Sequence, residues 1–143
     1  EEYPEMFRVV GELKVPYILM SVQPTLAKMM KGFAREVQQL RDLGAKDIIL
    51  DPGFCFGKNL IQNYQIYDEM EKLNVLELPV LVGISRKSMI YKLLGGDATT
   101  SLNRTTVLDT IALMKGASIL RVHDVKEAAE AVKIVEAMKE GRV

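Results

Sequence analysis

The chain has 143 residues, 48% of them hydrophobic, and its 19 Lys and Arg residues balance its 19 Asp and Glu residues. This length and composition predict one folded domain with a sizeable apolar core, and the zero net charge argues against a general nucleic-acid binder. The single cysteine excludes an internal disulfide and favours a reducing, cytoplasmic compartment, while the lack of a long apolar run or a signal-peptide pattern in the sequence argues against a membrane partner.

The first segment of the chain already has helical character. Residues 1–14 carry Met6, Val9, Val10 and Leu13 at helical spacing, and residue 1 is Glu rather than Met. We therefore expect a helix before the first strand, and we expect the chain to begin partway through a larger protein.

Four short apolar runs follow, separated by apolar stripes at helical spacing. The runs are rich in Val, Ile and Leu without strict alternation, which is typical of parallel strands covered on both faces. Glycines mark the ends of several helical stripes. The predicted strands are 15–20, 47–50, 78–84 and 118–122; the predicted helical stripes are 26–40, 64–73, 102–114 and 128–138, with a shorter helix from Arg86 to Gly95 and a loop at 95–101.

This order predicts an α/β fold of four βα units, spaced as βαβ units require. Two architectures fit: an open doubly wound sheet, or part of a (β/α)₈ barrel, whose usual length is about 250 residues. In both, ligands bind beyond the carboxyl ends of the strands. Those strand ends are therefore where we expect a functional site.

The second predicted strand ends in "DPGFCF", which begins at Asp51. Asp before Pro-Gly is a common turn composition, so Asp51 could simply cap the turn. A carboxylate there could also accept two hydrogen bonds from an amidine-like edge, as in an aminopyrimidine ring. Phe54 and Phe56 could both be core residues, but a slot for a flat ring is an equally open interpretation, with one of the two in the core.

The third strand is followed by "SRKS", residues 85–88. Ser85 is a candidate N-cap for the next helix, with Ser88 three residues later. Lys87 could be a solvated surface lysine, yet a cation in a first helical turn opposes the macrodipole and calls for a nearby anion or acceptor. The amides of this turn could bind an anion.

The fourth strand ends in Arg121, Val122 and His123. A lone histidine is often structural, but residues i and i+2 of a strand point to the same side, so Arg121 and His123 together could bind phosphate. Cys55 has no base partner nearby in sequence and is expected to be inert. With one Cys and one His, the chain shows no Cys/His metal pattern, so we predict no metal ligand in it.

Three segments carry a family resemblance: "LDPGFCFGKN" (50–59), "LPVLVGISRKSMI" (78–90) and "ILRVHDVKEA" (119–128). In order and spacing they closely resemble dihydropteroate synthase, and the similarity covers nearly the whole chain. The resemblance implies a TIM-type (β/α)₈ barrel, with residues 1–143 as its C-terminal part, strands five to eight, and the N-terminal half absent.

The resemblance also implies a cytoplasmic transferase of folate biosynthesis, the sulfonamide target, which joins 6-hydroxymethyl-7,8-dihydropterin diphosphate to 4-aminobenzoate. Magnesium would assist the diphosphate from a ligand in the missing half, and a homodimer is expected. By resemblance, Asp51 would hold the pterin, Phe56 and Ser88 the aminobenzoate, Lys87 would border both, and Arg121 and His123 would bind the diphosphate, with Lys87, Arg121 and His123 as the catalytic group.

Two departures keep other functions open. Cys55 stands where the family usually has Gly, and Ser21 stands where it usually has His. A pterin-binding methyltransferase domain, which needs no "SRKS" site, and a degenerate non-catalytic barrel fragment are the alternatives. Because the first four strands of the family are missing, we expect the isolated chain to be inactive or to pair with another copy.

Overall fold

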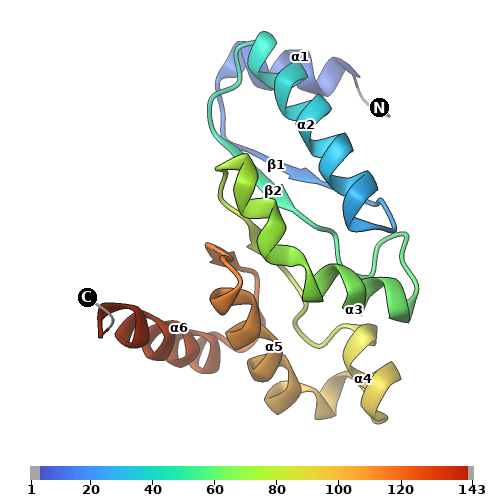
Figure 1. The fold of residues 1–143 in the computed structure, drawn as a ribbon, viewed down its shortest axis with the longest axis vertical. Helices are drawn as coiled ribbons and strands as arrows, with labels where there is room; N and C mark the ends of the chain where they lie inside the picture. Colours follow the sequence, from blue (N-terminus) through green and yellow to red (C-terminus); the bar gives the residue numbers. More distant parts are fainter. Residues whose placement is uncertain (1–3, 142–143) are drawn as a thin grey trace.

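The computed structural model describes residues 4–141 as an α/β structure in which each strand is followed by a helix (Figure 1). Helix α1 precedes the first strand, as expected. The elements are α1 (Pro4–Leu13), β1 (Tyr17–Met20), α2 (Leu26–Asp42), β2 (Ile48–Asp51), α3 (Leu60–Asp68), the 3₁₀ helix η1 (Met70–Leu76), β3 (Leu81–Val82), α4 (Ser88–Leu94), the 3₁₀ helix η2 (Ala98–Thr100), α5 (Leu102–Met114), β4 (Ile119–Leu120) and α6 (Val125–Glu140).

The strands run parallel, and their order in space follows their order in sequence. β1 pairs with β2, with Tyr17 opposite Ile48, and β3 pairs with β4, with Leu81 opposite Ile119. A single parallel bridge between Leu50 and Val80 joins the two pairs. Because every strand runs the same way, all four carboxyl ends lie at one edge, where parallel folds bind their ligands.

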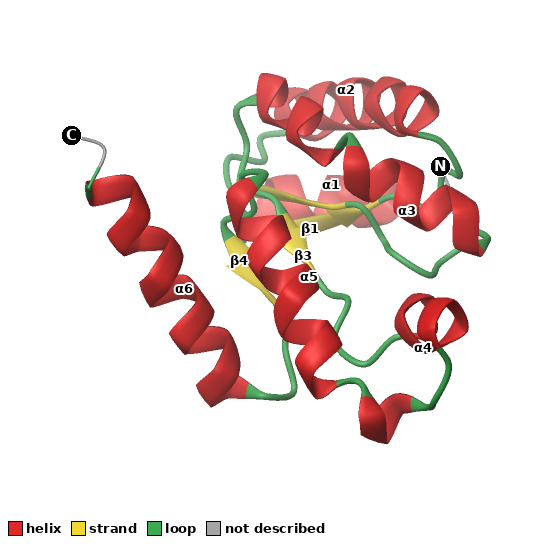
Figure 2. Ribbon diagram, turned by 60° about the horizontal axis from the view of Figure 1, so that its bottom comes forward, coloured by secondary structure: helices red, strands yellow, loops and turns green. Residues whose placement is uncertain are grey.

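The apolar core lies between the strands and the helices on their outer side. Helix α2 contributes a buried stripe of Leu26, Met29, Phe33, Val37 and Leu40, as its helical spacing predicted. Strand β3 is buried along its length, and β2 is buried except at Ile49, which is partly exposed. At the far end of the row, α6 lies beside α5 and stands clear of the other helices (Figure 2).

The strands are shorter than predicted, since only residues 81–82 of the run 78–84 and 119–120 of the run 118–122 form ladders. Within residues 4–141, β4 has a strand partner on one side only, so its ends lack a second neighbour, while the run of β3 is joined to β2 only by the single bridge at Val80. The predicted stripe 64–73 begins earlier, at Leu60, because Asn59 and Gln62 form a capping box. That stripe then changes to 3₁₀ geometry at Met70.

The interpretation of Ser85 as a helix N-cap is wrong. Helix α4 begins at Ser88 rather than Arg86, and its N-cap is Lys87. Arg86 has a φ of 54°, a left-handed conformation that cannot join the helix. Within residues 4–141, no helix combines the length and apolar character needed to cross a membrane.

One buried polar group belongs to the core rather than to the strand ends. Asp109 of α5 is 2% exposed, and its Oδ1 atom has no hydrogen-bond partner. Burial, with a smaller contribution from Asp124, raises the pKa of Asp109 to about 6. The folded state therefore favours the protonated carboxyl, which can donate as well as accept.

We predict that Asp109 makes the fold less stable as pH rises. Its pKa is higher in the folded chain than the unfolded value of about 3.9, so its full contribution is present below that value and is lost as pH rises through about 6. Thermal unfolding of Asp109→Asn should show a higher Tm than wild type at pH 7.5, by a few degrees, and a difference that shrinks toward pH 4. A difference that is constant across this range would contradict the prediction.

Candidate ligand site at the carboxyl ends of the strands

Asp51 is the last residue of β2, and its carboxylate is buried at 2% exposure. Its Oδ1 accepts a hydrogen bond of 2.8 Å from the backbone N–H of Gly53, and its Oδ2 lies 3.6 Å from Nη1 of Arg121. The turn-capping interpretation is therefore right for one oxygen. The other oxygen faces a cation across a gap longer than a hydrogen bond, so Oδ2 remains able to accept a donor from a ligand.

Arg121 follows β4 directly, and its backbone N–H extends the ladder to Val82. Its guanidinium lies against Gly83, where a Cβ atom would come within 2.7 Å of Nη2. Gly83 therefore leaves the space that lets Arg121 reach across β3 toward Asp51. The ion pair Arg121–Asp51 consequently spans β2, β3 and β4 and links their ends.

His123 and Ser85 connect the loops after β4 and β3. The backbone N–H of His123 donates to Oγ of Ser85, and Nδ1 of the ring lies 2.9 Å from the same Oγ. When the hydroxyl donates to Nδ1, the other ring nitrogen, Nε2, carries the proton and is available to a ligand. Arg121 and His123 lie just beyond the strand rather than on it, yet both line one cavity.

That cavity has a volume of about 120 Å³ and is lined by Gly83, Ser85, Lys87, Arg121, Val122 and His123. It brings together three of the residues predicted from sequence: Lys87, Arg121 and His123. A larger hollow of about 370 Å³ lies between α3 and α4, but its lining is almost entirely apolar. The smaller cavity is the candidate site because it gathers the charged groups.

Lys87 lies between the cavity and the loop that follows β2. Its Nζ donates a 3.0 Å hydrogen bond to the carbonyl of Phe54 and lies 4.8 Å from the centre of the Phe56 ring. Burial lowers its pKa, and Arg121 lowers it further, whereas Cys55 and Asp51 act in the opposite direction. The sequence analysis expected a nearby anion or acceptor for Lys87. The structure provides the Phe54 carbonyl as the acceptor, and the Phe56 ring as an aromatic face beside the cation.

The two phenylalanines have different roles, as one of the two sequence interpretations proposed. Phe54 is 1% exposed and packs on Tyr67, while Phe56 is 46% exposed. Cys55 between them has a φ of 71°, so the residue that stands in place of the usual Gly keeps a left-handed backbone. Its amide donates to Oδ1 of the buried Asn63, which holds the turn.

Ser88 is the first residue of α4, and its hydroxyl donates to the Cys55 sulfur at 3.7 Å. Sulfur is a weak acceptor, so this hydroxyl can exchange it for a stronger one. Ser88 and Phe56 do not line the small cavity: Ser88 contacts Cys55, and Phe56 contacts Lys87, which does line it.

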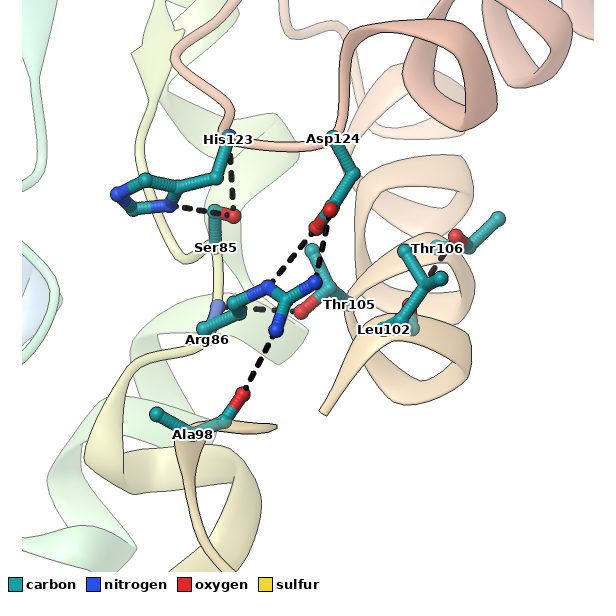
Figure 3. A network of polar contacts seen from close by, with 8 residues as sticks. All are labelled: Ser85, Arg86, Ala98, Leu102, Thr105, Thr106, His123 and Asp124. Carbon is teal, nitrogen blue, oxygen red and sulfur yellow. Dashed lines mark hydrogen bonds and ion pairs between the residues drawn. The ribbon is translucent and has the colours of Figure 1, made fainter. Parts of the chain in front are cut away.

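Sequence reasoning missed a second layer of residues that hold these loops together. Arg86 forms a bidentate ion pair with Asp124 at 3.0 and 2.8 Å, and it also donates to the carbonyl of Ala98 (Figure 3). The amide of Arg86 donates to Oγ1 of Thr105. Asp124 is the N-cap residue of α6 but makes no side-chain cap bond there, since its carboxylate is engaged by Arg86.

Lys58 is a further residue without an assigned role in the sequence analysis. Its Nζ donates to three backbone carbonyls, those of Ser21, Gly53 and Phe56. Burial lowers its pKa to about 8, opposed by Asp51 and Cys55 and reinforced by Lys87. The "GK" that follows the two phenylalanines was the available signal, but sequence alone does not show which carbonyls converge.

Comparison with known proteins gives a consistent result. The family described as "Pterin binding enzyme" matches residues 1–123. The dihydropteroate synthases of Escherichia coli and Bacillus subtilis are 37% and 33% identical to this chain, each over 94% of it and over 53% and 50% of their own length. The chain therefore spans about half the length of the curated relatives it matches.

Solved structures agree with the sequence comparison. A Yersinia pestis dihydropteroate synthase bound to a pterin–sulfa conjugate superposes with a TM-score of 0.91 at 38% identity, covering 96% of this chain and 57% of that one. The Xanthomonas albilineans dihydropteroate synthase with 4-aminobenzoic acid gives 0.89 at 28% identity, covering 95% and 54%. With its family match, its sequence relatives and its strand-end geometry in agreement, this chain belongs to the pterin binding enzyme family.

Proposed function

We propose that this chain forms strands five to eight of a dihydropteroate synthase barrel and supplies much of its substrate site. The reaction would join 6-hydroxymethyl-7,8-dihydropterin diphosphate to 4-aminobenzoate, giving dihydropteroate and diphosphate. The observation that carries the proposal is the meeting of Asp51, Lys87, Arg121 and His123 at one edge of the strands. Relatives named dihydropteroate synthase support the choice of reaction.

In this proposal Asp51 accepts hydrogen bonds from the aminopyrimidine edge of the pterin. Each carboxylate oxygen has two acceptor positions. The Gly53 amide occupies one of them on Oδ1, and Oδ2 faces Arg121 beyond hydrogen-bond distance. A flat edge with two donors can therefore bind both oxygens without displacing the turn. The buried position of Asp51 would strengthen these charge-assisted bonds.

The cations would stabilise the leaving diphosphate. In the reaction, the aniline nitrogen forms a bond to the pterin methylene carbon as the carbon–oxygen bond breaks, and the diphosphate leaves with the electron pair. A proton is then lost from the nitrogen. Arg121, His123 and Lys87 line one cavity and would meet the negative charge that develops on the departing oxygen. No enzyme nucleophile is required.

Phe56 and Ser88 would position the aminobenzoate. The half-exposed ring of Phe56 offers an aromatic face with Lys87 above it, and the Ser88 hydroxyl could exchange the Cys55 sulfur for the substrate carboxylate. Two related structures support substrates of these kinds, since one contains 4-aminobenzoic acid and another, from Coxiella burnetii, contains pteroic acid.

Magnesium is implied by the family, but the part of the chain that the structure describes does not fit a metal site. No group of three His, Cys, Asp or Glu side chains within residues 4–141 is placed to hold an ion. We therefore assign no step to magnesium and propose that any ligand for it lies outside this chain. The expected homodimer likewise remains a prediction.

The rest of the barrel would cover the two outer strands. The outer edges of β1 and β4 have no strand partner within residues 4–141, and the side chains of Ile18, Met20 and Ile119 on these two strands are exposed. Open edges with apolar side chains favour pairing with further strands. We propose that four additional βα units complete the structure and the site.

The proposed function can be tested with a chimera in which residues 1–143 replace the matching region of the Escherichia coli relative. We expect this chimera to form dihydropteroate, and we expect Asp51→Asn within it to lose pterin affinity by about 3 kcal/mol, because a neutral amide leaves one pterin donor unpaired. Calorimetric titration with the pterin and a turnover assay provide the measurements. Normal pterin affinity in Asp51→Asn would show that the pterin binds elsewhere.

Arg121→Met should weaken binding of the pterin diphosphate by about 2 kcal/mol and binding of the phosphate-free pterin by less, since a charge-assisted contact is lost with the phosphate. Arg121→Lys is the matched control, because it keeps the charge opposite Asp51 but loses the bidentate fork. Affinities for both ligands should be measured in the same chimera. Equal losses for the two ligands would contradict the assigned role.

The Arg86–Asp124 pair should couple the loops after β3 and β4. Its side chains are 29% and 19% exposed and joined by two hydrogen bonds, so we expect Arg86→Met and Asp124→Asn to show a favourable coupling in a double-mutant cycle. The more exposed pair Arg8–Glu12, with side chains 51% and 60% exposed, is the control, and its coupling should be clearly smaller. Urea unfolding of all variants gives these energies, and equal coupling in the two pairs would refute the assignment.

A further inference from the structure

Lys58 occupies a position that its sequence context does not explain. Its Nζ lies 2.9 Å from the carbonyl oxygens of Gly53 and Phe56 and 3.2 Å from that of Ser21. An ammonium group has three N–H donors, so all of them are used. None of the ion pairs found among residues 4–141 includes Lys58. The lysine is therefore held by backbone carbonyls rather than by a carboxylate.

These three carbonyls belong to two segments that approach each other closely. A Cβ atom on Gly53 would come within 2.2 Å of the Ser21 carbonyl oxygen, and one on Gly57 within 2.7 Å of the Val22 carbonyl oxygen. The loop 53–57 thus packs its backbone directly on the end of β1. Carbonyl oxygens that converge in this way repel one another, and a cation between them offsets that repulsion.

The same loop is held from its other side by Lys87, which donates to the carbonyl of Phe54. Two lysines therefore bind three of the four carbonyls from Gly53 to Phe56. The loop that they hold carries the half-exposed side chain of Phe56. Because Cys55 has a left-handed backbone in this loop, the loop includes a conformation that L-residues rarely adopt. External contacts are needed to keep it.

We propose that Lys58 is a positioning residue that fixes the loop 53–57 against the end of β1 and so sets the orientation of Phe56. Lys58 touches neither Asp51 nor the cavity-lining side chains through a hydrogen bond, so it acts through the loop backbone. Its pKa of about 8 leaves the amine mainly protonated at pH 7. If Lys58 were an ordinary solvated lysine, replacing it would leave the loop 53–57 unchanged.

The expected effect of Lys58 on ligand binding rests on the proposed function. The claim that Lys58 orders the loop 53–57 does not. If Phe56 lines the aminobenzoate site, releasing the loop should reduce aminobenzoate affinity more than pterin affinity. Asp51 depends less on the loop, because β2 and Arg121 hold it in addition to the Gly53 amide.

The test is amide hydrogen exchange, at pH 7, of the 143-residue chain carrying Lys58→Met. Protection of the amides of Cys55 and Phe56, which donate to Asn63 and Gly53, should fall about tenfold or more. Lys46→Met is the matched control, since Lys46 is exposed and its replacement removes the same charge. In Lys46→Met, protection of the Cys55 and Phe56 amides should stay within about twofold of wild type. Unchanged protection in Lys58→Met would overturn the proposal.

A second measurement covers the case in which Lys58→Met does not fold. In the wild-type chain labelled with ¹⁵N lysine, the Nζ group of Lys58 should be more restricted than that of Lys46, because three carbonyls hold it. Equal mobility of the two amines would refute the proposal. Binding of 4-aminobenzoate and of a pterin is measured in parallel in the completed chimera; if wild type binds neither, the proposed function fails while the exchange result still decides the role of Lys58.

Discussion

The buried carboxylate of Asp51 is the constraint on which the site depends. A carboxylate at 2% exposure is costly unless hydrogen bonds and an opposite charge compensate it. The Gly53 amide supplies the hydrogen bond, and Arg121 supplies the charge from a strand two positions away. Meeting this requirement brings together the loops after β2 and β4, and the absence of a side chain on Gly83 lets Arg121 cross between them.

Around this pair, the loops are held mainly by contacts between side chains and backbone. Lys58 and Lys87 bind the carbonyls of the loop after β2, while Ser85 binds the amide and ring of His123. Arg86 then joins the beginning of α4 to the beginning of α6 through Asp124. Such contacts fix loop geometry without filling the cavity, so the cavity stays open to a ligand.

The α/β class, the helix 26–40 and the gathering of Lys87, Arg121 and His123 beyond the strand ends could be predicted from sequence, because apolar spacing and polar strand ends are local patterns. Phe54 and Phe56 show the limit of sequence patterns: one is buried and the other half-exposed, and two identical residues on either side of Cys55 carry no signal for which is which. The local pattern predicts Ser85 as a helix cap, whereas its hydroxyl contacts His123, which lies 38 residues away. A local pattern carries no signal for so distant a partner. The left-handed conformation of Arg86 is likewise set by distant Thr105 and Asp124.

The charge balance of the site favours an anionic ligand. Lys58, Lys87 and Arg121 lie around one buried carboxylate, and burial lowers the pKa of both lysines, with Lys58 reaching about 8. An anion bound in the cavity that Lys87 lines would replace part of the lost solvation and raise the pKa of Lys87 again. Because the anion favours the protonated amine of Lys87, its affinity would decline as pH rises through the lowered pKa of that lysine. A set of partly desolvated cations with a single compensating carboxylate would therefore be stabilised by a bound anion, as the proposed function requires.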